Sequence, residues 1–415
     1  MLDINFIRDN KELVAQAALH KNRPVDLDRL LELDEKRREL MQSAQALREE
    51  RNTLSQQGNS QEARTRGKAL KEELKKIEDE AGGFEEEYTD LLHQVVNVPL
   101  PEVPVGKDEE DNVQMRTWGT PREFDFPVLD HVQLGESLDL IDLQRGSKIS
   151  GFRGYFIKNQ LAQLQFALLF WVFQKLVAKG YTPMIAPSVV KGFTLFGSAH
   201  FPWGKVDDVY QTDEDTFLSG TAEIPVTAYY SGETLNEKDL PMKFVALSPS
   251  FRKEAGAYGK DTKGILRVHE FWKIEQVILA PANVDQAREL HAELQANTEE
   301  IMRDLDLPYE VLLMCTGDMG EPQVLKYDTQ VWIPSQNTYR EIGSNSIMGD
   351  FQARRLNIRY KADDGTTKFV YTLNDTAIPS TRALIAIMEN YQQKDGSITV
   401  PKVLQPLVGF DTIKA

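Results

Sequence analysis

Three short segments of the chain concentrate charged and hydroxyl side chains among apolar ones. In the first, FRKEAGAYGKDTKGILRVHEFWKIEQ, Arg252 and Glu254 lie in one strand-like run, and Arg267, Phe271 and Glu275 follow on the return. A hairpin would bring these side chains near one another. The arginine can bind a phosphate, the first glutamate can accept a hydrogen bond from an amino group, and the phenylalanine offers a flat apolar surface. Surface ion pairs on a hairpin are the alternative that this segment alone leaves open.

The second and third segments offer oxygen ligands and an anion-binding arginine. In TYREIGSNSIMGDFQARR, Glu341 and Ser344 place two hard oxygen groups close together. Mg²⁺ commonly takes one or two carboxylates plus substrate phosphates, so this pair suits a metal bridged to a triphosphate. In TLNDTAIPSTRAL, Arg382 falls where a helix begins, and there a guanidinium and free helix N–H groups can meet an anion. Each spacing is also common on ordinary surfaces.

Composition sets limits on the class of protein. The chain has 415 residues, with 48 basic against 64 acidic side chains and a net charge of −16, so a nucleic-acid partner requires a local basic patch. Its one cysteine, Cys315, excludes an intrachain disulfide and a cysteine-cluster zinc site. The start, MLDINFIRDN, does not suit a secretory signal, and the apolar stretch at 161–173 is shorter than a membrane span. We therefore expect a cytoplasmic protein with no membrane role and no zinc.

Residues 28–97 predict two long helices. They contain no proline and are dominated by Leu, Ala, Glu, Lys, Arg and Gln. Leucines recur every seven residues in the first half, and the second half alternates spacings of four and three: Leu70, Leu74, Ile77, Ala81, Phe84, Tyr88, Leu91 and Val95. The turn-rich QQGNSQEARTRG, with Gly58, Asn59, Ser60 and Gly67, separates the halves. The pattern predicts an antiparallel helical hairpin that projects roughly 44 Å at ~1.5 Å per residue.

The outer half of this hairpin is basic. Residues 48–76 hold five acidic side chains against eight basic ones: Arg48, Arg51, Arg64, Arg66, Lys68, Lys71, Lys75 and Lys76. Two interpretations fit this count: an ordinary solvated helix surface, or an arm whose basic side chains contact the phosphate backbone of a nucleic acid.

A proline-rich acidic linker, VPLPEVPVGKDEEDN, predicts a domain boundary near residue 110, which gives an N-terminal domain at 1–110 and a second domain at 111–415. In the second domain we expect helices at 159–179, 284–304 and 381–390 among strands at 243–246, 271–279, 330–333 and 369–373. Strands adjacent in sequence predict an α+β domain with a largely antiparallel sheet. The chain has neither a G-x-G-x-x-G fingerprint nor a P-loop.

Taken together, these segments resemble the bacterial-type seryl-tRNA synthetases, which are class II aminoacyl-tRNA synthetases. LSGTAEIPVT resembles the family's TAE loop, FRKEAGAYGKDTKGILRVHEFWKIEQ its motif 2, and NTYREIGSNSIMGDFQARR its metal and serine segment. TPMIAPSVV resembles motif 1, the dimer-forming element, and the likeness continues to ENYQQKDGSITVPKVLQP near the C-terminus. The resemblance implies a six- to eight-stranded antiparallel catalytic sheet, an attached helical hairpin and a homodimer.

The resemblance also implies roles for individual residues. The serine-binding residues would be Thr221, Ala222, Glu223, Glu275, Asn374 and Thr376. The ATP-binding residues would be Arg252, Lys253, Glu254, Arg267, Phe271, Glu341, Ile342, Gly343, Ser344 and Arg382. Among them Arg252 matches the arginine on the α-phosphate and the serine carboxylate, Glu254 the acid that reads adenine, and Arg382 the arginine on the γ-phosphate; with Glu341 the two arginines form the catalytic set. Glu341 and Ser344 would hold Mg²⁺, and the basic outer half of the hairpin would bind tRNA(Ser).

The implied reaction activates L-serine with ATP to seryl-adenylate and then transfers the seryl group to the 3′ end of tRNA(Ser), with tRNA(Sec) left open as a second acceptor. One departure concerns motif 3, where NDTAIPSTR stands in place of a glycine-rich sequence resembling NGSGLAVGR. We expect the backbone at Asp375, Ala377 and Pro379 to alter the pocket floor. Two alternatives follow: a paralogue that loads a carrier, or one that has lost activity and binds through its coiled coil.

Overall fold

A computed structural model describes residues 1–415 except 57–60, 201–208, 256–258, 260 and 415. The chain divides into two compact units, Met1–Val98 and Pro99–Ala415. The division falls at the start of the proline-rich linker, earlier in the chain than the boundary near residue 110 that composition suggests.

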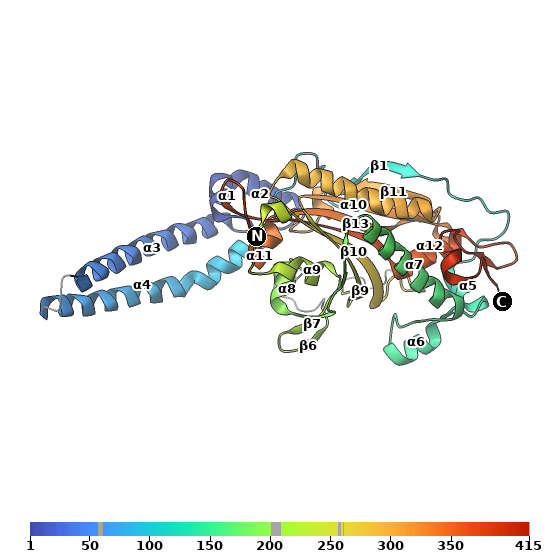
Figure 1. The fold of residues 1–415 in the computed structure, drawn as a ribbon, viewed down its shortest axis with the longest axis horizontal. Coiled ribbons are helices and arrows are strands. Elements are labelled where there is room, and N and C mark those ends of the chain that lie inside the picture. The colour runs from blue at the N-terminus through green and yellow to red at the C-terminus, as the bar shows by residue number, and fades with distance from the viewer. Residues whose placement is uncertain (57–60, 201–208, 256–258, 260, 415) are drawn as a thin grey trace. The chain divides into compact units, whose positions relative to one another are not determined.

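The first unit is helical. It contains α1 (Ile4–Asp9), α2 (Lys11–His20), α3 (Leu27–Gln56) and α4 (Gln61–Gln94), and α3 packs against α4 (Figure 1). This confirms the predicted helical hairpin. The predicted turn at Gly58, Asn59 and Ser60 lies outside the described residues. The remainder of that turn prediction is wrong, because α4 already includes Gly67.

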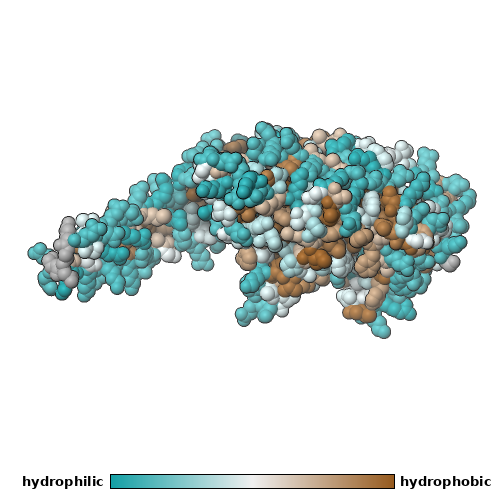
Figure 2. Space-filling view, in the orientation of Figure 1, coloured by the Kyte–Doolittle hydropathy of each residue, from teal (hydrophilic) through white to brown (hydrophobic). Residues whose placement is uncertain are grey.

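A narrow apolar seam and several ion pairs join the two long helices. Leu30 and Leu33 of α3 are buried in one cluster with Phe84 and Tyr88 of α4. Away from this cluster the hairpin surface is hydrophilic, as Figure 2 shows. Ion pairs cross between the helices at Arg29–Glu87 (2.7 Å), Arg37–Glu85 (3.1 Å), Arg48–Glu78 (3.2 Å) and Arg66–Glu50 (2.7 Å). Burial of these apolar side chains therefore sets the alignment of α3 and α4, and each exposed ion pair contributes little to stability.

The second unit is built on an eight-stranded sheet. In spatial order its strands are β1 (Val113–Trp118), β11 (Tyr309–Leu313), β12 (Leu325–Ile333), β13 (Thr338–Gly349), β16 (Tyr371–Pro379), β10 (Glu270–Ala280), β9 (Met242–Phe251) and β4 (Thr182–Ile185). Neighbouring strands in this sheet are antiparallel except at its edge, where β4 runs parallel to β9. The predicted α+β fold with a largely antiparallel sheet is confirmed.

Three helices pack on the sheet close to the predicted positions. They are α7 (Asn159–Ala178) on β9 and β10, α10 (Val284–Asp304) on β13 and β16, and α12 (Ser380–Asn390) on β12 and β10 (Figure 1). The expectation of no membrane span rested on the apolar stretch at 161–173, whereas the helix α7 that contains it has 20 residues and is, by length and composition alone, long and apolar enough to cross a membrane. Seven of its residues, including Leu161, Leu168 and Leu176, are buried in the core of this unit.

Shorter elements surround the large sheet. Before it in sequence are α5 (His131–Ser137), β2 (Ile141–Asp142), α6 (Leu143–Ser150) and β3 (Phe156–Ile157). Between β4 and β9 are β5 (Val189–Lys191), α8 (Gly192–Gly197), β6 (Gln211–Asp213), β7 (Thr216–Leu218), α9 (Glu223–Thr227) and β8 (Thr234–Asn236). The C-terminal third adds α11 (Phe351–Leu356), β14 (Arg359–Lys361), β15 (Thr367–Phe369), β17 (Ile398–Thr399), α13 (Gln405–Val408) and β18 (Thr412–Ile413).

The glycine-free motif 3 segment lies on one strand, β16, and contains a bulge. In the pairing with β10, Glu275 lies opposite Thr376 and Ile274 opposite Ile378, so Ala377 is an extra residue on β16. Asp375, Ala377 and Pro379 belong to this strand, and none of them has a positive φ. The backbone here therefore needs no left-handed residue, and its irregularity is the bulge beside Thr376.

Candidate functional site

The alternation of side chains along two central strands builds the site. In β16, Asn374 and Thr376 face one side of the sheet, and Asp375 faces α10, where its carboxyl group accepts from Thr298 at 2.6 Å. Glu275 of β10 pairs with Thr376 in register, so their side chains share the open face. Because side chains alternate along a strand, Asn374 and Thr376 face the open side of the sheet, and Asp375 between them faces the helix side.

Two adjoining pockets occupy this open face. We call the first the arginine pocket; among the predicted residues, its lining includes Arg252, Glu254, Arg267, Phe271, Glu341, Ile342, Gly343 and Arg382. We call the second the carboxylate pocket; among the predicted residues, its lining includes Thr221, Glu223, Arg252, Glu275, Glu341, Ser344, Asn374 and Thr376. Because Arg252, Lys273, Glu341 and Thr376 line both, the two pockets form one cleft.

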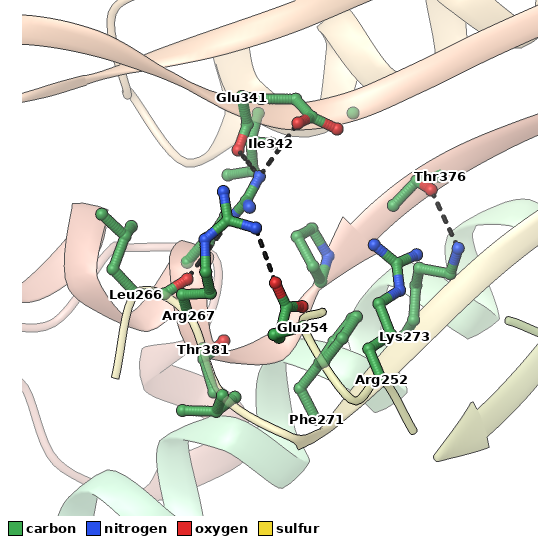
Figure 3. A pocket seen from close by; sticks show the side chains of 14 residues that line it. Arg252, Glu254, Leu266, Arg267, Phe271, Lys273, Glu341, Ile342, Thr376 and Thr381 are labelled. Atoms are coloured by element: carbon green, nitrogen blue, oxygen red, sulfur yellow. Dashed lines mark hydrogen bonds and ion pairs between the residues drawn. The ribbon is translucent and has the colours of Figure 1, made fainter. Parts of the chain in front are cut away.

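Arg252 stands at the junction of the two pockets. Its guanidinium lies 5.3 Å from the centre of the Phe271 ring, and its Nε donates to the Gly220 carbonyl at 3.3 Å. Figure 3 shows Arg252, Phe271 and Lys273 on one side of the cleft with Glu341 and Ile342 facing them from the other. A cation held in this way can contact anions in either pocket.

Two further arginines of the arginine pocket are each paired with a carboxylate. Arg267 donates to Glu254 at 2.6 Å (Figure 3). Arg382 donates to the Glu341 carbonyl at 2.7 Å and to its carboxylate at 3.3 Å. Partial desolvation in the cleft would by itself raise the pKa of the half-exposed Glu341, but the charges of Arg382, Lys326 and Arg252 outweigh it and hold that pKa below its ordinary range. Glu341 is therefore ionised at neutral pH.

The carboxylate pocket holds a closed hydrogen-bond network around Glu275. This fully buried carboxylate forms an ion pair with Lys273 at 2.6 Å and accepts from the Thr376 hydroxyl at 3.1 Å. Asn374 Nδ2 donates to Glu275 at 3.2 Å and to Glu223 at 3.1 Å, while its buried Oδ1 has no partner among the described residues. The pocket is therefore preorganised for a small polar ligand.

Glu223 is the second carboxylate of this network. It accepts from Gln352 at 2.8 Å and lies 3.5 Å from the imidazole of His200. Burial, together with the nearby charge of Glu275, raises the pKa of Glu223 to about 7. Burial also lowers the pKa of His200 to about 4, so this imidazole is neutral at neutral pH.

Two predicted site residues lie elsewhere. Ala222 is fully buried in a hydrophobic cluster rather than lining the cleft. The Lys253 ammonium lies 5.8 Å from the centre of the Tyr210 ring and lines neither pocket.

Sequence reasoning missed polar residues of the carboxylate pocket, and three of them belong to the network around Glu275 and Glu223. Lys273 precedes Glu275 by two positions in one strand, and the strand period of two was a signal that could have identified it. His200 and Gln352 come from distant segments, after α8 and within α11, and no local pattern marks them.

The predicted metal ligands lie in the same cleft. Glu341 and Ser344 both line the carboxylate pocket, and Ser344 pairs in register with Asp328 of β12. Across the described part of the chain, no group of three or more His, Cys, Asp or Glu side chains is arranged to hold a metal ion.

The eight predicted tRNA-binding residues all lie on the described helices of the hairpin. Arg48 and Arg51 belong to α3, and the other six belong to α4. Arg66 forms ion pairs with Glu50 and Glu73 at 2.7 and 3.1 Å, so part of the basic charge is compensated within the hairpin. Lys68, Lys71, Lys75 and Lys76 are exposed.

We expect an Asp375→Asn substitution to stabilise the protein increasingly as the pH rises from about 5 to 8. Burial, despite the hydrogen bond from Thr298, raises the pKa of Asp375 to about 8. The unfolded carboxyl ionises near its ordinary pKa while the folded one stays protonated, so folding stability falls across this range. Asparagine cannot ionise, and its oxygen can still accept from Thr298. The gain in melting temperature should reach several degrees at pH 8.

Thermal melts of both proteins at stepped pH test this expectation. Glu300→Gln serves as the control, because Lys175 and Lys179 lower the pKa of Glu300 to about 2 and it stays ionised throughout the range. A difference between wild type and Asp375→Asn that does not change with pH would contradict the prediction.

Comparison with known proteins assigns the chain to a family. The N-terminal domain model of seryl-tRNA synthetases matches residues 1–99, and the model of the class II tRNA synthetase core domain (G, H, P, S and T) matches residues 205–391. The serine--tRNA ligase of Symbiobacterium thermophilum is 42% identical, with 100% of both chains covered.

Solved structures agree with this assignment. The seryl-tRNA synthetase of Pyrococcus horikoshii complexed with ATP has a TM-score of 0.92 at 37% identity, covering 100% of this chain and 99% of that one. The cytoplasmic serine-tRNA ligase of Naegleria fowleri in complex with AMP has a TM-score of 0.89 at 30% identity, with the same coverage. The chain therefore belongs to the seryl-tRNA synthetases, the class II aminoacyl-tRNA synthetases that ligate serine to tRNA.

Proposed function

We propose that this enzyme activates L-serine with ATP in the cleft of the second unit and transfers the seryl group to the 3′ end of tRNA(Ser), in the cytoplasm. The observation that carries the proposal is that one arginine, Arg252, lines both the arginine pocket and the carboxylate pocket. A nucleotide in the first pocket and an amino acid in the second would meet at this guanidinium. That is the geometry needed for a carboxylate to attack an α-phosphate.

In the arginine pocket, positioning and charge neutralisation are the contributions we assign to the protein. Phe271 supports adenine, Glu254 accepts from its amino group, and Arg267 and Arg382 bind the triphosphate. Arg252 binds the α-phosphate and the serine carboxylate together, and stabilises the negative charge that develops as the carboxylate attacks phosphorus. The α-phosphorus–oxygen bond to pyrophosphate breaks, and the products are seryl-adenylate and pyrophosphate.

In the carboxylate pocket, charge and hydrogen bonding select serine. We assign the ammonium group of serine to Glu275, Glu223 and Thr221, and its hydroxyl group to Thr376 and the Asn374 oxygen that has no described partner. Alanine would leave these buried partners unsatisfied, which a well-built site rejects strongly. Threonine is excluded only by lack of room for one methyl group, worth ~1–3 kcal/mol.

Glu341 and Ser344 fit Mg²⁺ as a partner of the triphosphate. Glu341 is ionised, and Ser344 adds a neutral oxygen beside it in the same pocket. Mg²⁺ typically takes one or two carboxylates and completes its coordination with phosphates and water, which agrees with a donor set this small. When bound, the ion would neutralise phosphate charge.

An amino-acid panel in the ATP–pyrophosphate exchange assay tests the proposed activation step. We expect exchange with serine, far weaker exchange with threonine, and almost none with alanine. Transfer of labelled serine to total tRNA then separates tRNA aminoacylation from the loading of a carrier protein. Exchange that depends on an amino acid other than serine would overturn the proposal.

The hairpin of the first unit is the part that we propose to bind tRNA(Ser). The observation that supports this is the row of exposed lysines on α4, namely Lys68, Lys71, Lys75 and Lys76. These side chains can contact phosphates, so binding should weaken as salt is raised.

We expect a Lys68→Glu, Lys71→Glu, Lys75→Glu triple variant to lower kcat/KM for tRNA by about 10²-fold, because three attractive charges become repulsive. The rate of ATP–pyrophosphate exchange should not change. Steady-state aminoacylation at two salt concentrations, beside the exchange assay, checks both statements. Glu72→Lys is the matched control on the same helix and should not weaken aminoacylation. Equal losses in both assays would contradict the assignment.

We also propose a homodimer formed through the apolar surface near the edge strand β4. Phe166 and Phe170 of α7 are exposed at 70% and 56%, and Ile185 of β4 at 86%. Figure 2 shows hydrophobic residues gathered on this unit, and large exposed apolar patches mark association surfaces. The resemblance of the β4 segment to motif 1 supports a second copy of this chain as the occupant.

We expect a Phe166→Lys, Ile185→Glu double variant to be monomeric at micromolar concentration, because association would bury two charges among apolar groups. Light scattering after gel filtration measures the mass directly and should give one chain for the variant and two for the wild type. Val105→Lys, at a residue exposed elsewhere, is the control and should stay dimeric. A wild-type mass of one chain would refute the dimer.

A further inference from the structure

We propose that Arg153, which lies between α6 and β3 and outside every predicted motif, is a positioning residue of the ATP site that orients Glu254 toward adenine. The inference rests on the proposed function, because it takes the arginine pocket as the ATP site and Glu254 as its adenine-reading group.

Arg153 has a buried side chain that lies next to Glu254 and Arg267 of this pocket. Only 4% of the side chain is exposed. Its guanidinium donates to the Arg267 carbonyl at 3.3 Å and lies 3.9 Å from Glu254 Oε2. Arg267 donates to that same oxygen at 2.6 Å. Two guanidinium groups thus meet Glu254 at Oε2, and Oε1 is the oxygen that would accept from the amino group of adenine.

Glu254 needs such support because its own backbone does not fix it. β9 ends at Phe251, three positions earlier, and Glu254 has a φ of +56°, in the left-handed region that few non-glycine residues adopt. A side chain outside the strand ladder takes its direction from the groups that contact it. For Glu254 these include Arg267 from the same hairpin and Arg153 from a separate element.

The segment that carries Arg153 is itself held tightly. A Cβ added to Gly154 would lie 2.5 Å from the Gly146 carbonyl oxygen, so the two backbones touch. The Tyr155 hydroxyl donates to the Glu270 carbonyl at 2.9 Å. Arg153 and Tyr155 thus tie residues 146–157 to two points, Arg267 and Glu270, near the return strand of motif 2. This segment can therefore act as a platform for the adenine end of the site.

The consequence is a specificity effect confined to the nucleotide. Guanine presents a carbonyl oxygen where adenine presents an amino group, and an oriented carboxylate repels it. Without Arg153, Glu254 contacts one guanidinium group fewer, and its carboxylate can rotate away from adenine. ATP then binds less well while GTP is rejected less strongly. The serine-binding groups Glu275, Asn374 and Thr376 make their described contacts with one another and with Lys273 and Glu223, so serine binding should not change.

The test compares Arg153→Ala and Arg153→Lys with wild type in serine-dependent pyrophosphate exchange, using ATP and GTP as separate substrates. We expect Arg153→Ala to raise KM for ATP about 10-fold, with a similar fall in the ATP-to-GTP ratio of kcat/KM, because the ion pair with Glu254 and the hydrogen bond to the Arg267 carbonyl are both lost. KM for serine should stay within about 2-fold. Arg153→Lys should recover part of the effect, since an ammonium can still donate to the Arg267 carbonyl.

The control is Arg145→Ala on α6, whose side chain is 75% exposed and pairs with Asp142; it should leave all parameters unchanged. If Arg153→Ala does not fold, Tyr155→Phe, which removes the tie to Glu270 at nearly constant volume, carries the test with the same expected direction. An unchanged KM for ATP and an unchanged ATP-to-GTP ratio would overturn the inference, as would equal rises in KM for ATP and serine. Wild type that shows no serine-dependent exchange would instead overturn the proposed function.

Discussion

An Arg252→Ala enzyme is expected to lose about 10²- to 10³-fold in kcat for serine-dependent pyrophosphate exchange. Arg252 lines both pockets, so it is the guanidinium that can contact the α-phosphate and the serine carboxylate at once. Its stabilisation of charge grows in the transition state, where the attacking carboxylate and the phosphate share negative charge. The loss should therefore fall on kcat as well as on both KM values.

Arg252→Lys is the matched variant for this prediction. Lysine keeps the positive charge but loses the planar fork that can contact two anions and lie over the Phe271 ring. Activity should lie between those of wild type and the alanine variant. Initial rates at varied ATP and serine separate the parameters, and a melting curve confirms folding. An alanine variant with wild-type kcat would show that the two ligands do not meet at this residue.

The second large effect is expected at the hydroxyl group of Thr376, to which we assign the recognition of serine. A Thr376→Val enzyme should lose about 10- to 100-fold in kcat/KM for serine, while the low activity with alanine changes little. Valine has nearly the same shape but cannot accept from Lys273 or donate to Glu275, as Thr376 does at 3.2 and 3.1 Å. The serine-to-alanine ratio should therefore shrink by the same factor.

Thr376→Ser controls for this result because it keeps the hydroxyl group and removes one methyl. It should retain most of the discrimination against alanine and lose part of the discrimination against threonine, since it enlarges the pocket. Exchange rates with the three amino acids measure both ratios. An unchanged serine-to-alanine ratio in Thr376→Val would remove Thr376 from the recognition of serine.

Local sequence patterns predicted the elements that depend on short-range periodicity. The alternating seam from Leu70 to Val95 predicted α4, and the run at 284–304 coincides with α10. These predictions succeed because a helix is set by contacts within a few residues and by one continuous apolar face. The turn prediction at Gly67 failed because a helix can include an isolated glycine at a cost of ~1 kcal/mol when its neighbours favour the helix.

The sequence predicted the types of residue in the candidate site and some of the residues that line it. Arg252, Glu254, Phe271 and Glu275 lie on or beside two strands joined by one hairpin, so sequence proximity was enough to group them. Lys253 and Ala222 show the limit of this reasoning, because neighbours in a segment point to different sides. Ala222 lies in the core one position away from Glu223, which lines the pocket.

The sequence by itself determined the class of chemistry, namely arginines and carboxylates suited to a nucleotide and an amino acid, and the helical hairpin that accompanies them. Only the tertiary structure decided that Arg252 lines both pockets, that His200 and Gln352 complete the network around Glu223, and that Arg153 approaches Glu254. The physical reason is that residue types and short periods are local properties of the chain. Contacts between distant segments depend on how the strands and helices pack, and no local pattern records that packing.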